Sequence, residues 1–129
     1  IDCDEDCSGY VWDILYGPYE AAHDLDGVYA IDVLEHIPPD REDWALVNMR
    51  SHLKPHGKLI IGMPSRESQM HASSLSKLHH VNTKTEDELV ETMGRHFHTV
   101  YILGLNDYTL HDGFGPMCHY RFALCSGKR

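Results

Sequence analysis

The fold is decided by one stretch of the chain, Leu25-Asp26-Gly27-Val28-Tyr29-Ala30-Ile31-Asp32-Val33-Leu34-Glu35-His36-Ile37-Pro38-Pro39. It begins as a turn, continues as an apolar run over residues 28–33, and ends at two prolines. An apolar run bounded by turn residues is typical of a buried strand. Ligands of open α/β sheets bind beyond the carboxyl ends of such strands. Asp32, Glu35 and His36 therefore lie where a functional site is expected.

Further along the chain, helix and strand signals alternate. Pro39 and Asp40 predict the start of a helix over residues 40–53, with Trp44 on its apolar face. Thr85 and Glu88 form a capping box that predicts a second helix over residues 86–95. Strands are expected at residues 10–15, 28–33, 58–63, 98–105 and 118–126. The last two strands are joined without a helix, so we expect them to be antiparallel neighbours. Two long connections, residues 65–83 and 106–116, are expected to be loops.

The composition limits the classes of protein that this chain can represent. The chain has 129 residues, so we expect residues 1–129 to form a single domain. The net charge of −9 and the pI of about 5.5 argue against a nucleic acid or an anionic membrane as partner. No apolar run approaches the roughly 20 residues of a membrane helix. The four cysteines, without a Cys-x-x-Cys pair, predict free thiols and a cytoplasmic location.

Three phrases of the chain occur together in one known family. They are Leu25-Asp26-Gly27-Val28 followed by Asp32-Val33-Leu34-Glu35-His36-Ile37, then Leu53-Lys54-Pro55-His56-Gly57, then His80-Val81-Asn82-Thr83-Lys84-Thr85-Glu86-Asp87-Glu88-Leu89. In this order and spacing the chain resembles class I S-adenosylmethionine-dependent methyltransferases, over about residues 10–126. The resemblance implies a Rossmann-like three-layer α/β sandwich. Its sheet would be mostly parallel, with an antiparallel C-terminal strand.

The chain departs from that family near its N-terminus. The first strand and helix of the family are absent, and no Gly-x-Gly occurs in the first 57 residues to approach the cofactor. Without that strand, the strand at residues 28–33 would have an open apolar edge, which favours aggregation. We consider three explanations: N-terminal truncation of a longer protein, which we rank first; occupation of the gap by residues 10–15; or pairing with a second copy in a homodimer.

The resemblance assigns S-adenosylmethionine as cofactor and implies residues that contact it. Asp2 would accept hydrogen bonds from the ribose hydroxyls, and Asp13 would accept one from the adenine amino group. By family position, Ile14, Ala30 and Ile31 would line the same site. Each has an ordinary structural alternative: Asp2 as a solvated terminal acid, Asp13 as the cap of a turn, and the apolar residues as core.

The substrate side is indicated less directly. His36 could act as a base toward an oxygen or nitrogen substrate, although a structural role at the strand end explains it as well. We expect His80 to order the long loop over the site, and Asn106 and His111 to line the substrate pocket or a polar surface loop. No metal site is predicted, because the adjacent histidines of the 65–83 loop lack nearby acidic partners in the sequence.

The sequence therefore predicts an S-adenosylmethionine-dependent methyltransferase, or a truncated part of one, that acts on a small molecule. A non-catalytic methyltransferase-like module that serves in binding or assembly is the alternative. A nicotinamide-dependent Rossmann enzyme fits least, because its glycine fingerprint is absent.

Overall fold

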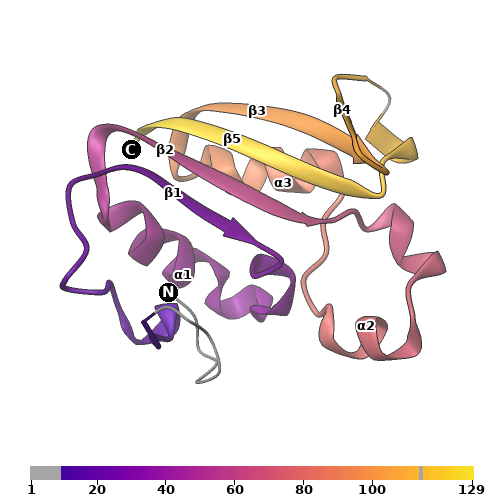
Figure 1. Cartoon of the computed structure of the whole chain (residues 1–129), viewed down its shortest axis with the longest axis horizontal. Helices are drawn as coiled ribbons and strands as arrows, with labels where there is room; N and C mark the ends of the chain where they lie inside the picture. The colour runs from indigo at the N-terminus through magenta and orange to yellow at the C-terminus, as the bar shows by residue number, and fades with distance from the viewer. Residues whose placement is uncertain (1–9, 114) are drawn as a thin grey trace.

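A five-stranded mixed sheet forms the centre of the computed structural model, which describes residues 10–113 and 115–129 (Figure 1). Its strands are β1 (Leu25–Ile31), β2 (Leu53–Pro64), β3 (Phe97–Asn106), β4 (Thr109–His111) and β5 (Tyr120–Lys128). They lie in the order β1-β2-β5-β3-β4. β1 and β2 are parallel, whereas β5 pairs antiparallel with both β2 and β3, and β4 pairs antiparallel with β3.

The prediction of a mostly parallel sheet is wrong, because three of its four strand pairs are antiparallel. β5 returns along β3 and inserts between β3 and β2. That insertion replaces one parallel neighbour pair with two antiparallel pairs. The expected antiparallel pairing of the last two long strands is confirmed.

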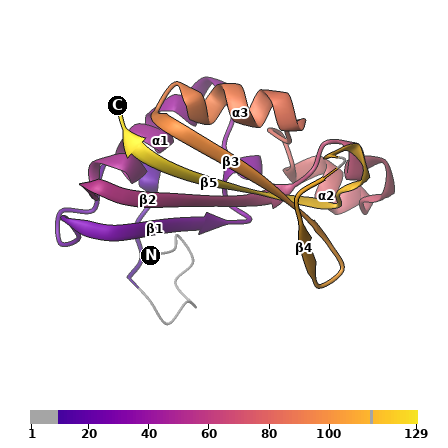
Figure 2. The same ribbon diagram turned by 90° about the horizontal axis from the view of Figure 1, so that it is seen from above.

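Two helices, α1 (Pro39–Ser51) and α3 (Glu86–Gly94), cover one face of the sheet (Figure 2). The core lies between them and the strands, and it includes Leu34, Leu46, Leu59, Ile61, Leu89, Met93 and Phe97. In α1 the buried stripe runs through Ala45, Leu46 and Met49, whereas Trp44 is 54% exposed. The expected capping box of α3 is confirmed: Thr85 accepts from the Glu88 N–H, and the Glu88 side chain accepts from the Thr85 N–H.

The opposite face of the sheet has no helix over it in the part of the chain that the structure describes. Strand register places Tyr29 beside Ile60, Ile60 beside Leu124, and Leu124 beside Tyr101. All four side chains are exposed. We call this row the open face. The described residues therefore form two layers, not the three-layer sandwich that we expected.

The strand expected at residues 10–15 does not form. Val11 makes an isolated bridge, and the 3₁₀ helix η1 (Ile14–Tyr16) follows. This segment packs against α1, where Asn48 Nδ2 donates to the Ile14 carbonyl at 2.6 Å and Trp44 Nε1 to that of Leu15 at 3.0 Å. It therefore does not fill the gap beside β1. Among the described residues β1 pairs with β2 alone, so its other edge is free.

The two long connections contain more structure than the sequence predicted. Residues 65–83 include the 3₁₀ helix η3 (Glu67–His71) and the helix α2 (Ser74–His79). Residues 106–116 include β4 and part of the 3₁₀ helix η4 (Gly115–Met117). β2 also begins earlier than the expected residue 58, because Lys54-Pro55-His56-Gly57 is part of the strand.

Candidate functional site

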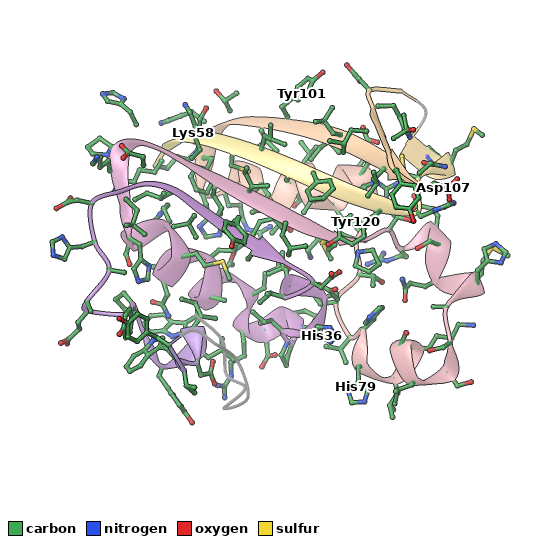
Figure 3. The ribbon with its side chains drawn as sticks, in the orientation of Figure 1. His36, Lys58, His79, Tyr101, Asp107 and Tyr120 are labelled. Atoms are coloured by element: carbon green, nitrogen blue, oxygen red, sulfur yellow. The ribbon has the colours of Figure 1, made fainter. Side chains whose placement is uncertain are left out.

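The candidate site lies at the edge of the sheet where β1 and β2 end and β5 begins (Figure 3). β1 ends at Ile31, and Asp32 turns the chain with a positive φ of 54°, which aspartate tolerates better than most residues. The Asp32 N–H still donates to the Gly62 carbonyl of β2 at 3.0 Å. The Tyr120 hydroxyl donates to Asp32 Oδ1 at 2.9 Å. The Asp32 carboxylate is thereby held at the end of β1.

A short 3₁₀ helix, η2 (Leu34–His36), follows β1. It contacts the end of the connection formed by residues 65–83 through two hydrogen-bonding contacts. The Asn82 N–H donates to the Glu35 carbonyl at 3.0 Å. His36 Nδ1 lies 3.1 Å from the His79 carbonyl oxygen. These two contacts bring His80 beside His36, with ring centroids 5.1 Å apart and the rings nearly perpendicular.

Glu35 is the buried acid of this site, with 1% of its surface exposed. Neither of its carboxylate oxygens has a hydrogen-bond partner among the described residues. Burial, with a smaller contribution from the charge of Asp32, raises the pKa of Glu35 to about 7. Its own backbone N–H and nearby His36 oppose that shift only in part. The carboxylate thus lies in a place that disfavours its charge.

His80 is the partly buried base of the site. Its Nδ1 lies 2.9 Å from Gln69 Oε1, which comes from η3. Burial, followed by the charge of neighbouring His36, lowers the pKa of His80 below its ordinary value. At neutral pH this imidazole is therefore neutral and has a lone pair available.

The segment that supplies His80 is fixed to the sheet by buried charged groups. Arg121 of β5 is 1% exposed and donates to both carboxylate oxygens of Glu67, at 2.8 and 3.1 Å, and to the Gly115 carbonyl at 2.8 Å. Lys84 Nζ pairs with the buried Glu42 carboxylate at 2.7 Å, and Asn82 Nδ2 donates to the same carboxylate at 2.7 Å. Because both ends of the segment are fixed, the position of His80 is well defined.

Comparison with known proteins identifies the fold. No protein-family model matches the chain, and no curated protein matches it in sequence. Among solved structures, one is an S-adenosylmethionine-dependent methyltransferase from Archaeoglobus fulgidus. The structural alignment covers 99% of this chain and 74% of the archaeal chain, with a TM-score of 0.71 and 18% sequence identity. The chain has the fold of class I S-adenosylmethionine-dependent methyltransferases.

Other solved methyltransferases match with similar scores. One from Thermotoga maritima, described as a possible histamine N-methyltransferase, has a TM-score of 0.67, with 17% identity and coverage of 83% of this chain. The small RNA methyltransferase HEN1 has a TM-score of 0.66, with 17% identity and coverage of 89%. The chain spans 57% of the first and 15% of the second. At these identities the matches establish the methyltransferase fold and leave the substrate open.

The predicted cofactor residues are distributed over several elements. Asp13 caps η1, because its Oδ1 accepts from the Leu15 N–H at 2.8 Å, and it lines an open hollow of about 420 Å³ with Val11, Trp12 and Tyr16. Ile14 packs against the core, Ala30 is buried in it, and Ile31 is 37% exposed at the end of β1. Asp2 lies outside the described residues. Cofactor contacts for all five remain predictions.

The predicted substrate residues separate into two places. His80 joins His36 at the end of β1, as described above. Asn106 and His111 pair with each other, with His111 Nε2 2.9 Å from Asn106 Oδ1, where β3 turns into β4. Asn106 Nδ2 also donates to the Met117 carbonyl at 3.0 Å. Both residues therefore have structural contacts at the β3–β4 turn, and their substrate role remains a prediction.

The sequence placed Glu35 and His36 at the site, but it did not reveal that His80 lies beside them. Glu35, His36 and His80 each present one atom that could bind a metal, and these three atoms lie within 4.8 Å of one another. The adjacent histidines of residues 65–83 have no acidic residue close to them in the sequence, so no metal site was predicted there. The signal that could have identified this cluster was Glu35-His36 directly after a buried strand, followed by a histidine near the end of the next long connection.

Two of the four cysteines lie in the described part of the chain. Cys118 and Cys125 are free and buried, and burial raises the pKa of Cys125 to about 12. Cys3 and Cys7 lie outside the described residues. No helix in the described part of the chain is both long and apolar enough to cross a membrane.

Proposed function

We propose that this chain is the C-terminal part of an S-adenosylmethionine-dependent methyltransferase that acts on a small molecule. The observation that supports the proposal most directly is the strand order, with β5 inserted antiparallel between β2 and β3. The same fold covers 99% of the chain in the archaeal methyltransferase.

Truncation is supported by the free edge of β1 and by the open face. The free edge faces the position where the resemblance places the first strand of the family. Apolar side chains of the open face, such as Ile60 and Leu124, are the kind of surface that a further layer would bury. The partial coverage of the matching chains agrees with this proposal.

The described residues fit one end of the cofactor. The hollow beside Asp13 has aromatic walls from Trp12 and Tyr16 and a carboxylate that could accept from an amino group, which suits an adenine ring. The glycine-rich turn that would meet the methionine end does not occur in the first 57 residues. We therefore assign the adenine contact to Asp13 and derive no chemical step at the sulfonium end.

Methyl transfer is an in-line displacement at a sulfonium methyl group, so positioning of the acceptor contributes much of the rate enhancement. His36 and Glu35 lie at the carboxyl end of β1, where ligands of open sheets bind. His36 could accept a proton from an acceptor group, because its ring is partly exposed and Glu35 Oε1 lies 3.9 Å from its Nε2.

The free thiols of Cys118 and Cys125 favour a cytoplasmic location for the protein.

A non-catalytic module is the second candidate. The open face supports it, because a row of exposed apolar side chains is a surface that a protein partner can cover. The open face would then bind the protein that the module helps to assemble.

Calorimetric titration with S-adenosylhomocysteine separates these candidates. The protein expressed from its natural gene, with any residues that precede Ile1, should bind this product of methyl transfer. Asp13→Ala should weaken binding at least about tenfold, because a charge-assisted hydrogen bond contributes roughly 1.5–3 kcal/mol. Glu20→Ala removes an exposed acid nearby and should leave binding unchanged. Absence of binding by the natural protein would contradict the methyltransferase proposal.

A further inference from the structure

The Glu35 carboxylate is unpaired and buried in the described structure. Its side chain is 1% exposed, and neither oxygen accepts a hydrogen bond from any described group. A buried carboxylate without a partner is costly, and proteins normally pair it or bind a cation to it. The residue that comes nearest to compensating this charge is His36, whose Nε2 lies 3.9 Å from Glu35 Oε1, too far for a hydrogen bond.

Two imidazoles complete a set of ligands around this carboxylate. One ligand atom each from Glu35, His36 and His80 lies within 4.8 Å of the other two. Glu35 and His80 are 45 positions apart in the sequence. A backbone hydrogen bond from Asn82 to Glu35 and the contact of the His36 ring with the His79 carbonyl hold the two segments together. Small side-chain rotations about a metal ion would bring all three atoms to the roughly 2.0–2.2 Å typical of metal–nitrogen and metal–oxygen bonds.

The partners of the two rings leave the correct nitrogens free. The His79 carbonyl can only accept, so His36 Nδ1 must donate to it, and the lone pair of a neutral His36 lies on Nε2. Gln69 Oε1 likewise accepts from His80 Nδ1, which leaves Nε2 of His80 unprotonated. Histidine ligands of metals characteristically donate their second N–H to a carbonyl or carboxylate oxygen in this way.

We propose that Glu35, His36 and His80 bind one divalent transition-metal ion. Two imidazole nitrogens and one carboxylate oxygen suit Zn²⁺, Mn²⁺, Fe²⁺ or Co²⁺, whereas Ca²⁺ and Mg²⁺ prefer sites built from oxygens alone. His36 and His80 are partly exposed, so the remaining coordination positions face solvent. The site does not depend on the methyl-transfer proposal, because a non-catalytic module would contain the same residues. With the metal bound, His36 Nε2 would be a ligand and would no longer serve as a base.

The second carboxylate of this edge fits the same proposal. Asp32 precedes Glu35 by three residues at the end of β1, and its carboxylate accepts from the Tyr120 hydroxyl. Two carboxylates at one edge repel each other when both are ionised, and a divalent cation at Glu35 would offset that repulsion.

Cobalt titration tests the proposal on the complete 129-residue chain, first treated with EDTA and then desalted. Co²⁺ should bind at one ion per chain with visible absorption of a nitrogen- and oxygen-ligated ion, and Zn²⁺ should displace it. Mg²⁺ at the same concentration should not compete. Glu35→Gln and His80→Ala should each weaken Co²⁺ binding at least about tenfold. Gln69→Ala removes the hydrogen-bond partner of His80 Nδ1 and should weaken Co²⁺ binding about tenfold.

Matched controls come from histidines beside the site. His79→Ala keeps the backbone carbonyl that accepts from His36, and His71→Ala removes an exposed ring of the same connection. Both should leave Co²⁺ affinity unchanged. Glu35→Gln removes an unpaired buried charge, so the metal-free variant should melt at least as high as the metal-free wild type while losing the metal response.

Three results would overturn the proposal. The first is that the wild type does not bind Co²⁺, and the second is that Glu35→Gln and His80→Ala bind Co²⁺ as tightly as the wild type. The third is that His79→Ala and His71→Ala weaken Co²⁺ binding as much as the site variants do. The last would indicate adventitious binding to surface histidines. If Glu35→Gln does not fold, His80→Ala decides the outcome, because the side chain of His80 is only partly buried and its loss removes no core packing.

Discussion

At the scale of single residues, Arg121 connects the segment that supplies His80 to the sheet. Its guanidinium is 1% exposed and joins Glu67, the Gly115 carbonyl and the Lys84 carbonyl, so one side chain fixes three segments. Removing one partner of a buried ion pair typically costs about 3–5 kcal/mol, and the lower end applies here because the Glu67 side chain is partly exposed. We therefore expect Arg121→Met to lower the free energy of unfolding by about 3 kcal/mol in urea denaturation at pH 7.

A conservative variant and a surface control refine this prediction. Arg121→Lys keeps the charge but loses the two-pronged contact with Glu67, so its loss should be intermediate. Arg41→Ala removes an exposed arginine and should change stability by less than about 0.5 kcal/mol. Equal stability of Arg121→Met and wild type would show that the network around Arg121 does not stabilise the fold.

The same ion pair gives the protein a pH dependence. Partial burial tends to raise the pKa of Glu67, but the hydrogen bond and charge of Arg121, with its own backbone N–H, lower the pKa below 4.5 overall. A carboxyl group with a lowered folded pKa stabilises the fold above its unfolded pKa and loses that effect as the pH falls. The wild type should therefore lose stability below about pH 4.5 more steeply than Arg121→Met.

Residue types at the site were partly predictable. Asp32, Glu35 and His36 follow a buried strand in sequence, and the structure places them at the carboxyl end of β1 as expected. The contact with His80 was not predictable, because it depends on where the chain returns after β2, η3 and α2. Backbone contacts such as that from Asn82 to Glu35 decide it, and no local pattern encodes them.

At the scale of elements, the capping box of α3 is the clearest case in which sequence and structure agree. Thr85 Oγ1 accepts from the Glu88 N–H, and Glu88 Oε2 accepts from the Thr85 N–H at 2.8 Å. Thr85→Ala should lower the free energy of unfolding by about 1 kcal/mol, the usual effect of losing an N-cap. Thermal or urea denaturation measures this change. Thr99→Ala, which removes an exposed strand threonine, is the control and should have the smaller effect.

The error at residues 10–15 has a physical cause. Aromatic and β-branched residues favour strands only where a neighbouring strand can pair with them. In the structure this segment instead lies on α1, where Trp44 and Asn48 bind its carbonyl groups, and Asp13 caps η1. Its hydrogen-bond partners are thus side chains distant in sequence, which a pattern of residue types cannot predict.

At the scale of the whole molecule, the sequence predicted the class of fold better than the direction of its strands. Alternating strand and helix signals identified the α/β class, and the phrases around Glu35 and His80 indicated the methyltransferase fold that the solved structures share. Strand direction depends on the position of β5 in the sheet. That position is a property of long-range pairing, which local periodicity does not contain.

The free edge of β1 leads to a measurable pattern in amide hydrogen exchange. The Asp32 N–H points to β2, where it donates to Gly62, so the two-residue period of a strand also directs the N–H groups of Val28 and Ala30 toward β2. Those of Tyr29 and Ile31 then point away from the sheet. NMR of the 15N-labelled chain should show slow exchange at Val28 and Ala30 and fast exchange at Tyr29 and Ile31.

β2 provides the internal reference, because it has a neighbour on each side and its amides at Ile60 and Ile61 should all exchange slowly. Uniformly slow exchange along β1 would mean that a further strand binds the side that is free among the described residues. If that strand comes from a second copy of the chain, the alternation should return on dilution, since a pairing between copies depends on concentration. The amides of a single strand can thus report whether the sheet ends at β1 or continues into another molecule.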